Sequence, residues 1–398
     1  MTNQIIDQIK LLAENNRSKF IEMRRHLHAN PELSFEEFET SKFVKNQLIK
    51  IGITNIEHVA NTGIVALIKG KNSEKKVIAL RADLDALPIL EQNDVMYKSN
   101  NLGVMHACGH DVHTTCLLGA AEILFNLRES FEGTIKLIFQ PGEEKLPGGA
   151  SLMIAENVLE NPSPEAIFGQ HVMPLIPVGK VGFKSGLYMA SSDEIFIKVI
   201  GKGGHGAMPH LNIDPIVIAA QIIIALQQIV SRMASPIIPS VLSFGKINAN
   251  GATNVIPNEV FIEGTFRTLD EKWRFDAHEK MIKMASLIAE GMGGKCEFEV
   301  RKGYPFLRND EDLTSLAKHG AIEYLGNENV IDLDTWMAAE DFAYYSQIIP
   351  ACFYRLGTRN EKKGIVSSVH TPTFDIDEDA LNIGVGLMAY LAIKKLSN

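Results

Sequence analysis

The stretch MHACGHDVH, residues 105–113, places one cysteine, three histidines and one aspartate within nine residues. Thiolate, imidazole and carboxylate groups are the side chains that bind transition metals, and packing alone is a poor explanation for five of them in so short a run. The apolar residues 116–121 follow at once, which indicates a loop that leads into a buried helix. Because side chains at such a junction can converge on one point, the stretch is a candidate metal-binding loop and not merely a His-rich polar loop.

Short apolar runs flank this loop and helix along the chain. Three runs have the pattern of buried strands: residues 77–80, 134–139 and 166–168. Helical patterns lie between them, at 105–125 and 149–159, and two more precede them, at 7–27 and 36–49. This alternation predicts an α/β fold with a mixed, largely parallel sheet.

Polar residues follow each predicted strand. Asp83 and Asp85 come after the first, Glu143 and Glu144 after the second, and His171 after the third. In open α/β sheets the ligand site lies beyond the carboxyl ends of the strands, so these side chains are expected at one rim. Taken alone, acids at a strand end are as readily solvated turn residues, and a lone histidine is usually structural. The metal interpretation depends on their combination with residues 105–113.

The pattern changes near Ser191 and predicts a second, inserted domain. The expected elements have the order β-α-β-β-α-β of a ferredoxin-like unit: 194–200, a helix capped by Asp214 with Pro215 at its first position, 241–247, 260–267, a helix from Asp270 to Ala289, and 297–301. Helical patterning resumes at 311–325 and ends with 378–396. We therefore expect a discontinuous catalytic domain, residues 1–187 and 303–398, and an inserted lid and dimerisation domain, residues 188–302.

Net charge, cysteine count and hydropathy limit the partners and the cellular location that are expected for the protein. The chain of 398 residues has a net charge of −9, which argues against nucleic acid as a partner. Four cysteines in so long a chain do not form a disulfide framework, so a reducing, cytoplasmic location is expected. The apolar window 213–230 is interrupted by glutamines at helical spacing and is interpreted as a half-buried helix, with no membrane span and no signal peptide expected.

Seven motifs, in this order, resemble the peptidase M20 family of dinuclear metallo-amidohydrolases, in the branch of aminoacylases, hippurate hydrolases and auxin-conjugate hydrolases that has a cysteine in its metal-binding loop. The motifs are residues 81–88, 105–113, 143–144, 203–210, 254–257, 339–342 and 370–377. The resemblance implies hydrolysis of the amide bond of N-acyl amino acids, such as N-acetyl amino acids or hippurate. The alternatives are a dipeptidase or carboxypeptidase of the same family, and a catalytically silent small-molecule binding protein on the same fold.

The resemblance also implies a role for particular residues. Five resemble metal ligands: Cys108, His110, Glu144, His171 and His370. Glu143 resembles the general base and Asp85 the aspartate that orients a ligand. His205 resembles the histidine that enters the active site of the other subunit of a homodimer, where it stabilises the oxyanion, and Asn254 and Arg267 resemble substrate-binding residues of the lid.

Two divalent metal ions are implied as cofactors. Thiolate and imidazole favour zinc and the carboxylates tolerate manganese, with cobalt or nickel as further alternatives. The substrate is expected to be an N-acyl amino acid or a short peptide. The chain departs from the branch pattern at two positions, where Val112 and Gly142 replace the usual glycine and alanine.

Overall fold

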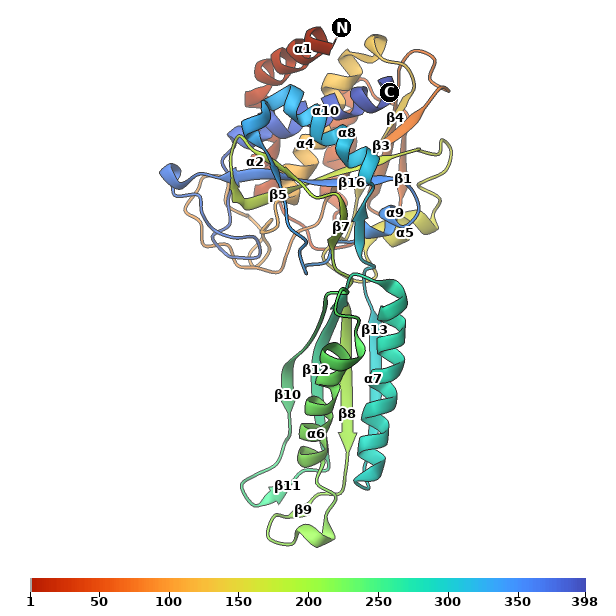
Figure 1. Cartoon of the computed structure of the whole chain (residues 1–398). Coiled ribbons are helices and arrows are strands. Elements are labelled where there is room, and N and C mark those ends of the chain that lie inside the picture. Colours follow the sequence, from red (N-terminus) through yellow and green to blue (C-terminus); the bar gives the residue numbers. More distant parts are fainter. Residues whose placement is uncertain (1) are drawn as a thin grey trace. The chain divides into compact units, whose positions relative to one another are not determined.

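The computed structural model describes residues 2–398, which form two compact units (Figure 1). Unit 1 contains the residues through Gly186 together with Arg308–Asp334 and Asp341–Asn398, and unit 2 contains Leu187–Leu307 and Thr335–Glu340. The first segment of unit 2 contains residues 188–302, for which an inserted domain is predicted, and extends five residues beyond them to Leu307. Unit 2 also includes the segment Thr335–Glu340, which lies far along the chain from the rest of the unit.

Unit 1 is built on an eight-stranded sheet with the order β1-β2-β4-β3-β5-β16-β6-β15. Its strands are β1 (Ile56–Val59), β2 (Gly63–Lys69), β3 (Val77–Asp83), β4 (Thr134–Gln140), β5 (Ile167–Pro177), β6 (Val181–Phe183), β15 (Val330–Asp332) and β16 (Ala351–Arg359). The central strands β4, β3, β5 and β16 pair in parallel, whereas β1, β2 and β6 add antiparallel pairs. The mixed α/β class with a largely parallel central sheet is as predicted.

Helices cover both faces of this sheet. They are α1 (Thr2–Asn15), α2 (Arg17–Ala29), α3 (Phe38–Ile51), α4 (His110–Asn126), α5 (Gly149–Ala155), α8 (Glu311–Leu325), α9 (Ala343–Ser346) and α10 (Asp379–Ser397). Along β3, Ile78 and Leu80 enter the main core with α4 and α10, while Arg81 points to the opposite face, where Phe342 precedes α9. The helix expected over residues 7–27 is broken at Asn16, whose side-chain amide donates to the Leu12 carbonyl and competes with the helical backbone bonds.

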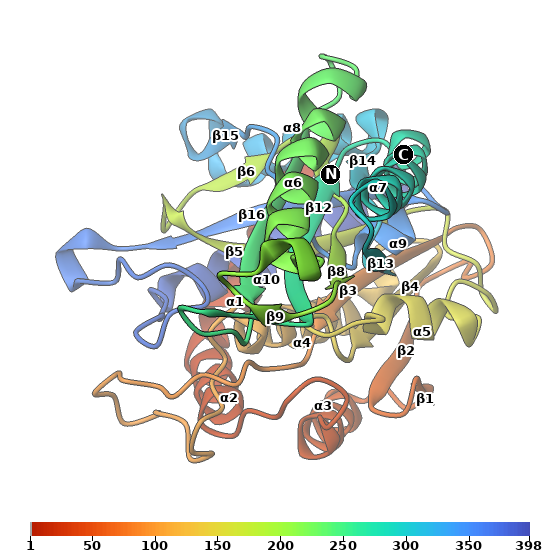
Figure 2. The same cartoon turned by 90° about the horizontal axis from the view of Figure 1, so that it is seen from below.

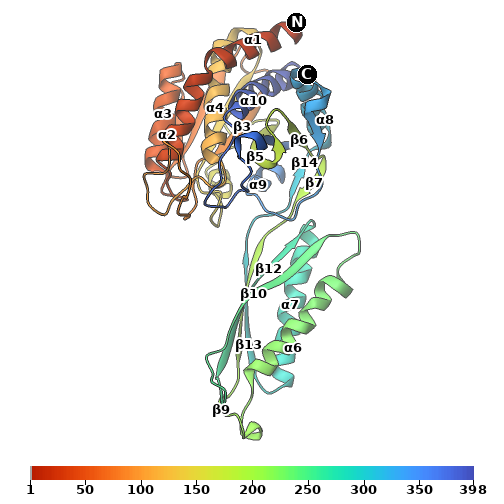
Figure 3. The ribbon, with the colours of Figure 1, turned by 90° about the vertical axis from the view of Figure 1, so that its left-hand side faces the viewer.

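Unit 2 has the predicted β-α-β-β-α-β order. Its elements are β8 (Asp193–Ile200), α6 (Pro215–Gln228), β10 (Ser240–Asn248), β12 (Glu259–Thr268), α7 (Glu271–Gly291) and β13 (Lys295–Lys302). The four strands form an antiparallel sheet with the order β10-β12-β8-β13, and α6 and α7 lie side by side (Figure 2) on one face of it (Figure 3). Asp214 and Asp270 cap the two helices as expected, each accepting hydrogen bonds from backbone N–H groups of the first turn.

Shorter elements complete the chain. The strand pairs are β9 (Gly204–His205) with β11 (Val255–Ile256), and β7 (Gly186–Met189) with β14 (Leu307–Asn309). Single helical turns occur at Arg128–Ser130, Pro209–Leu211, Ile229–Met233, Asn327–Asn329 and Glu361–Lys363. All four cysteines are free thiols.

One helical segment, Pro215–Met233, is long and apolar enough to cross a membrane by length and composition, with a mean hydropathy of 1.7. Core helices of soluble proteins meet the same criterion. In unit 2, Ile218, Ile222 and Leu226 of this segment are buried in a cluster with the sheet residues, and 28% of the segment is buried. The segment therefore has the one-sided burial of a helix that covers a sheet.

Candidate metal centre and active site

Three neighbouring parallel strands deliver polar residues to one rim of the unit 1 sheet. In the register of β3, Asp83 lies opposite Gln140 of β4 and Arg81 lies opposite Gly169 of β5. Asp85, Glu143 and Glu144 follow these strand ends at the same edge. His171 lies two residues beyond Gly169 but still within β5, which continues to Pro177 and does not end before His171 as the sequence pattern predicted. This edge is the location that parallel strand pairing predicts for a ligand site.

The loop before α4 brings Cys108 and His110 to the same rim. Between them, Gly109 has φ +83°, a left-handed conformation that favours glycine. A Cβ atom at this position would lie 2.6 Å from Val172 Cγ2 of β5, so the close approach of the loop to the sheet also requires glycine.

The five predicted ligands lie together in two overlapping groups. Cys108, His110 and His171 form one group, and Cys108, Glu144 and His370 form the other, with the potential ligand atoms of each group within 4.8 Å of one another. Cys108 Sγ is 3.5 Å from His171 Nε2, and His370 Nε2 is 3.1 Å from Glu144 Oε1. The Cys108 thiol belongs to both groups, which is the position of an atom that could bridge two ions.

Hydrogen bonds orient two of the imidazole rings towards this point. His171 Nδ1 donates to the Val172 carbonyl at 2.7 Å, and His110 Nδ1 donates to Asp85 Oδ1 at 3.1 Å. Each Nε2 atom is thereby left for a ligand, and His110 Nε2 is buried without a hydrogen-bond partner among residues 2–398. A carboxylate or carbonyl that fixes the tautomer in this way is the usual partner of a metal-binding histidine.

The electrostatics of the site also fit a cation. Burial raises the pKa of the Cys108 thiol well above its usual value, and the nearby Glu144 and Glu143 carboxylates raise it further. Burial lowers the pKa of His110, but Asp83, Asp85 and Glu144 together raise it to about 10. Both shifts express an excess of negative charge that a divalent ion would neutralise, because a coordinating thiol is deprotonated and a coordinating imidazole gives up its proton. The thiolate, imidazole and carboxylate donors therefore suit a transition-metal ion.

Asp85 joins several parts of the site. Its Oδ1 accepts from His110, while its Oδ2 accepts from Ser34 Oγ at 2.6 Å and from the backbone N–H of Glu144 at 2.9 Å. Asp85 is 1% exposed, so its position is fixed by these contacts. The carboxylate links the metal-binding loop to the turn that carries the two glutamates.

Glu143 and Glu144 lie on a tight turn after β4. Glu143 is 6% exposed, and its Oε1 lies 3.4 Å from the backbone N of Asp341. The buried Glu37 carboxylate accepts from the Gly142 N–H at 2.8 Å and from Thr62 Oγ1 at 2.7 Å. Burial, followed by the charge of Asp85, raises the pKa of Glu37.

The sequence interpretation missed Ser34 and Glu37, which hold this part of the site. Both belong to the segment PELSFEE, residues 31–37, where Phe35 has φ +69°. The only signal in the sequence was the acidic residues of this segment, because the left-handed conformation of Phe35 is visible only in the structure. It carried no weight because the segment has no metal-binding spacing.

Asp83 and His113 pair with each other, whereas both ring nitrogens of His106 are buried without a hydrogen-bond partner among the described residues. His113 Nδ1 donates to Asp83 Oδ1 at 2.6 Å and its Nε2 accepts from the Val172 N–H, while Asp83 Oδ2 accepts from Arg81 at 2.7 Å. Burial lowers the pKa of His106 to about 4, so this imidazole is neutral. Val112, one of the two departures from the branch pattern, is fully buried in the main core.

Three predicted residues lie in unit 2, and the structure does not bring all of them together. His205 is exposed on β9, next to Asn254, whose carbonyl accepts from Gly206 N–H at 2.8 Å (Figure 1). Arg267 lies at the other end of the sheet, where it follows the paired residues Phe266 and Asp193 and donates to the Met337 carbonyl at 3.1 Å. The eight registered pairs of β8 and β12 are seven residue steps long and separate the two ends by about 23 Å at roughly 3.3 Å per residue.

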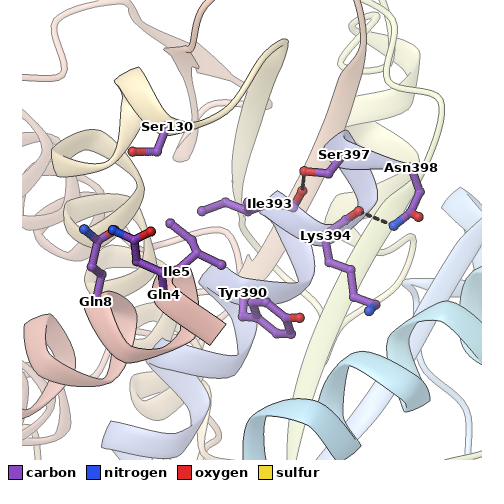
Figure 4. Close-up of a pocket in the computed structure, with 9 residues that line it drawn as sticks. All are labelled: Gln4, Ile5, Gln8, Ser130, Tyr390, Ile393, Lys394, Ser397 and Asn398. Atoms are coloured by element: carbon purple, nitrogen blue, oxygen red, sulfur yellow. Dashed lines mark hydrogen bonds between the residues drawn. The ribbon is translucent and has the colours of Figure 1, made fainter. Parts of the chain in front are cut away.

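A separate cavity of about 500 Å³ lies between α1 and the C-terminal turns of α10 (Figure 4). Its lining includes Gln8, Tyr390 and Lys394. Lys394 and Tyr390 both contact Glu323, and the lining contains none of the predicted ligands. The metal-binding chemistry therefore lies elsewhere in unit 1.

The rim of the largely parallel sheet holds two overlapping ligand groups beside a buried glutamate. This combination is typical of the metal-dependent hydrolases. Comparison with known proteins is more specific. Residues 79–394 match the model of peptidase family M20/M25/M40, and the chain belongs to this family. It is accordingly a hydrolase that acts on amide bonds.

Individual relatives resemble the chain over nearly its whole length. N-acetyl-L-cysteine deacetylase of Bacillus subtilis (strain 168) is 42% identical over 378 residues, which are 95% of this chain and 88% of the relative. Thermostable carboxypeptidase 2 of Saccharolobus solfataricus is 39% identical over 394 residues, 98% of each chain. The crystal structure of the Bacillus subtilis YXEP protein, described as a dinuclear metal-binding peptidase from the M20 family, aligns with a TM-score of 0.83 and 37% identity over 96% of this chain and 99% of that one.

Proposed function

We propose that the protein is a metal-dependent amidohydrolase that cleaves N-acyl amino acids into a carboxylic acid and a free amino acid. The observation that carries the proposal is the pair of ligand groups that share Cys108 beside the buried Glu143. The similarity to an enzyme named for deacetylation of an N-acetyl amino acid supports this substrate class. Two divalent ions, zinc or manganese, would be held by Cys108, His110 and His171 on one side and by Cys108, Glu144 and His370 on the other.

The chain's own residues would divide the chemistry among them. When bound, the two ions would polarise the carbonyl group of the substrate and lower the pKa of a water molecule. Glu143 accepts the proton of that water and delivers it to the departing amine, and it is held for this task by the turn that Glu37 and Asp85 fix from either side. Asp85 keeps the His110 ring in the tautomer that leaves Nε2 for the metal.

His205 is suited to donate a hydrogen bond to the oxyanion. Its Nδ1 accepts from the Ala207 N–H at 3.1 Å, which leaves Nε2 as the donor atom of the ring. Such a donor, placed where negative charge develops, stabilises the transition state of acyl transfer. Asn254, beside His205, and Arg267 would bind the substrate, Arg267 as a partner for a carboxylate.

The separation of His205 from Arg267 supports a homodimer. One small substrate cannot contact both ends of a sheet that spans about 23 Å. If both residues act on one N-acyl amino acid, they come from different subunits. This is the arrangement that the family resemblance implies for His205.

Unit 2 also has a suitable surface for a second copy. The edge strand β10 has a single charged residue, Lys246, in nine, whereas the opposite edge strand β13 alternates lysine, glutamate and arginine. Charges protect an edge strand from pairing with another chain, so β10 is the unprotected edge. The adjacent helix α6 has no charged residue from Pro215 to Gln228, and its Val217 and Ile224 side chains are exposed. We place the dimer contact at β10 and α6.

Substitution of the two adjacent glutamates tests the mechanism. Glu143→Gln should retain both metal ions and lose at least about 100-fold in kcat, while Glu144→Gln should lose metal as well as activity. Metal content by atomic emission and turnover of N-acetyl amino acids, with zinc, manganese or cobalt added, provide the two readouts. Wild-type turnover by Glu143→Gln would remove this residue from the mechanism.

A comparison of N-acetyl amino acids with peptides as substrates separates the amidohydrolase from the alternative functions. A carboxypeptidase of this family, as the similarity to the Saccharolobus solfataricus enzyme suggests, would prefer peptides over N-acetyl amino acids. A wild-type protein that hydrolyses none of these compounds with any metal would instead be a binding protein.

Sedimentation of wild type and Ile224→Lys tests the dimer. Ile224 is 65% exposed in the single chain, and a charge placed in the proposed dimer contact should dissociate the dimer.

A further inference from the structure

A buried arginine connects the chain segment that carries His110 with the segment that carries His370. The Arg24 side chain of α2 is 0% exposed; its Nε donates to Asp111 Oδ2 at 2.8 Å and its Nη2 donates to Asp375 Oδ1, also at 2.8 Å. Asp111 follows His110 directly, and Asp375 lies five residues after His370. One planar guanidinium therefore spans the metal-binding loop and the loop that carries His370.

The two ends of this link belong to a larger polar network. His28 Nδ1 lies 2.8 Å from the same Asp111 oxygen, and Tyr97 donates its hydroxyl to the second oxygen of Asp375 at 2.8 Å. The guanidinium carbon of Arg24 lies 4.9 Å from the centre of the Tyr97 ring. These contacts fix the plane of the guanidinium and therefore the separation of its two carboxylate partners.

The His370 loop depends on such contacts for its position. Residues 366–378, all within the described chain, form no helix or strand, and the His370 side chain is 52% exposed. Its backbone has φ +61°, and its N–H donates to the Ala107 carbonyl at 2.7 Å. The loop is further held by the Gln92 N–H, which donates to the Pro372 carbonyl at 2.8 Å, by the Asn93 amide, which donates to the Phe374 carbonyl at 2.9 Å, and by the buried Phe374 ring. At Asp375 it is held by Arg24, a fully buried charge.

Stability is a weak reason for this arrangement. Burying a guanidinium and a carboxylate costs several kcal/mol per ion, roughly offset by their attraction, so that apolar replacements are often neutral or stabilising. What a buried, hydrogen-bonded ion pair does supply is geometry. The geometry supplied here is the distance between His110 and His370, which stand in the two different ligand groups.

We propose that Arg24 is a positioning residue that sets the spacing of the two ligand groups and thereby the affinity for the pair of metal ions. The inference rests on the proposed function, since it assigns Arg24 to the same metal centre. The planar guanidinium of Arg24 presents separate N–H groups to Asp111 and to Asp375. A lysine ammonium is a compact point charge, and at this position it could satisfy only one of the two carboxylates.

The chain offers a matched control. Arg25, the next residue of α2, donates to both oxygens of Glu378 at the end of the same loop and also stacks on Tyr97, but it is partly exposed and, within residues 2–398, forms no hydrogen bond or ion pair with Asp111. Arg25→Met therefore removes a contact to the loop without touching the metal-binding segment. Arg24→Met, Arg24→Lys and Arg25→Met should be compared as full-length proteins. Metal affinity is measured by competition with a chelator, and the visible spectrum of the cobalt-loaded protein reports coordination geometry.

We expect Arg24→Met to lose 10- to 100-fold in affinity for at least one ion, the usual cost of removing an outer partner of a metal ligand, and to change the cobalt spectrum. Arg24→Lys should lie between Arg24→Met and wild type, and Arg25→Met should match wild type. If Arg24→Met does not fold, Asp375→Ala decides the question, because it removes one end of the link and leaves the Arg24–Asp111 pair intact. The same loss is expected of it.

Wild-type affinity and an unchanged spectrum in Arg24→Met, or in Asp375→Ala, would overturn the role of Arg24 while leaving the proposed function standing. Equal losses in Arg24→Met and Arg25→Met would also overturn it, because they would indicate a general effect on α2. A wild-type protein that binds no divalent ion and hydrolyses no N-acyl amino acid would instead overturn the proposed function, and the inference with it.

Discussion

Replacement of Gly142 by alanine is expected to damage both stability and turnover. Gly142 has φ +53°, and a Cβ atom there would lie 2.2 Å from Cε1 of Phe35. This is the position at which the chain departs from the branch pattern by having glycine. The side chain that occupies the space of the missing methyl group is the Phe35 ring, so Phe35 and Gly142 form a complementary pair.

The two contributions to the cost can be separated. An alanine in the left-handed region costs roughly 1–2 kcal/mol, and forcing a methyl group into a packed position adds about 1–3 kcal/mol. Gly142→Ala should therefore lower the free energy of unfolding by about 2–5 kcal/mol. Gly179→Ala is the matched control: Gly179 has φ +98° and nothing within 4 Å of its would-be Cβ, so only the conformational part applies.

The effect on activity follows from what the turn carries. Gly142 precedes Glu143 and Glu144, and its N–H is held by Glu37. A displacement of about 1 Å at a catalytic group can cost about 100-fold in rate. We expect kcat/KM of Gly142→Ala to fall by about this factor and that of Gly179→Ala to stay at the wild-type value.

Urea unfolding and hydrolysis of an N-acetyl amino acid provide the assays. The double variant Phe35→Ala/Gly142→Ala should recover part of the lost turnover, because the ring that meets the new methyl group is gone, and the two substitutions should be non-additive, as expected for residues in contact. If Gly142→Ala is as stable and as active as Gly179→Ala, the turn does not depend on the Phe35–Gly142 contact and the reasoning is refuted.

Three further outcomes can be measured on other parts of unit 1. Cys108→Ala removes the atom shared by both ligand groups, so metal content should fall for both ions, and unchanged content in emission spectroscopy would exclude Cys108 as a ligand. Asp85→Asn replaces the acceptor of His110 Nδ1 and Glu144 N–H, so chelator competition should register a 10- to 100-fold weaker affinity. Burial lowers the pKa of Lys136 to about 8 from 10.5, so the unfolded chain binds more protons between these values and the free energy of unfolding rises with pH across this window. Urea titrations at pH 8 and pH 10 measure this rise in the free energy of unfolding, and Lys136→Met should reduce it by up to about 3 kcal/mol. An equal rise in wild type and Lys136→Met would contradict the lowered pKa of Lys136.

The fold was largely accessible from the sequence because its signals are local. The apolar runs at β3, β4 and β5 are buried on both faces of the sheet, and such strands have continuous hydrophobic patterns. Asp214 and Asp270 were predicted as helix caps because capping depends on neighbouring residues along the chain. The break at Asn16 was missed, since helical periodicity continues across it and the interruption is seen only in the Asn16 backbone angles, φ −103° and ψ 6°.

The sequence by itself also determined the ligand chemistry, because residue types at strand ends and in residues 105–113 restrict which ions can bind. The tertiary structure decided how these residues combine. It makes Cys108 common to two groups, and it pairs Asp83 with His113, which together with His110 form a further possible ligand group. It also brings Arg24, Ser34 and Glu37 against the site from elements far away in the chain. Such contacts have no sequence signal, because a buried hydrogen bond depends on distance and direction in space, whereas periodicity records only which side of an element is apolar.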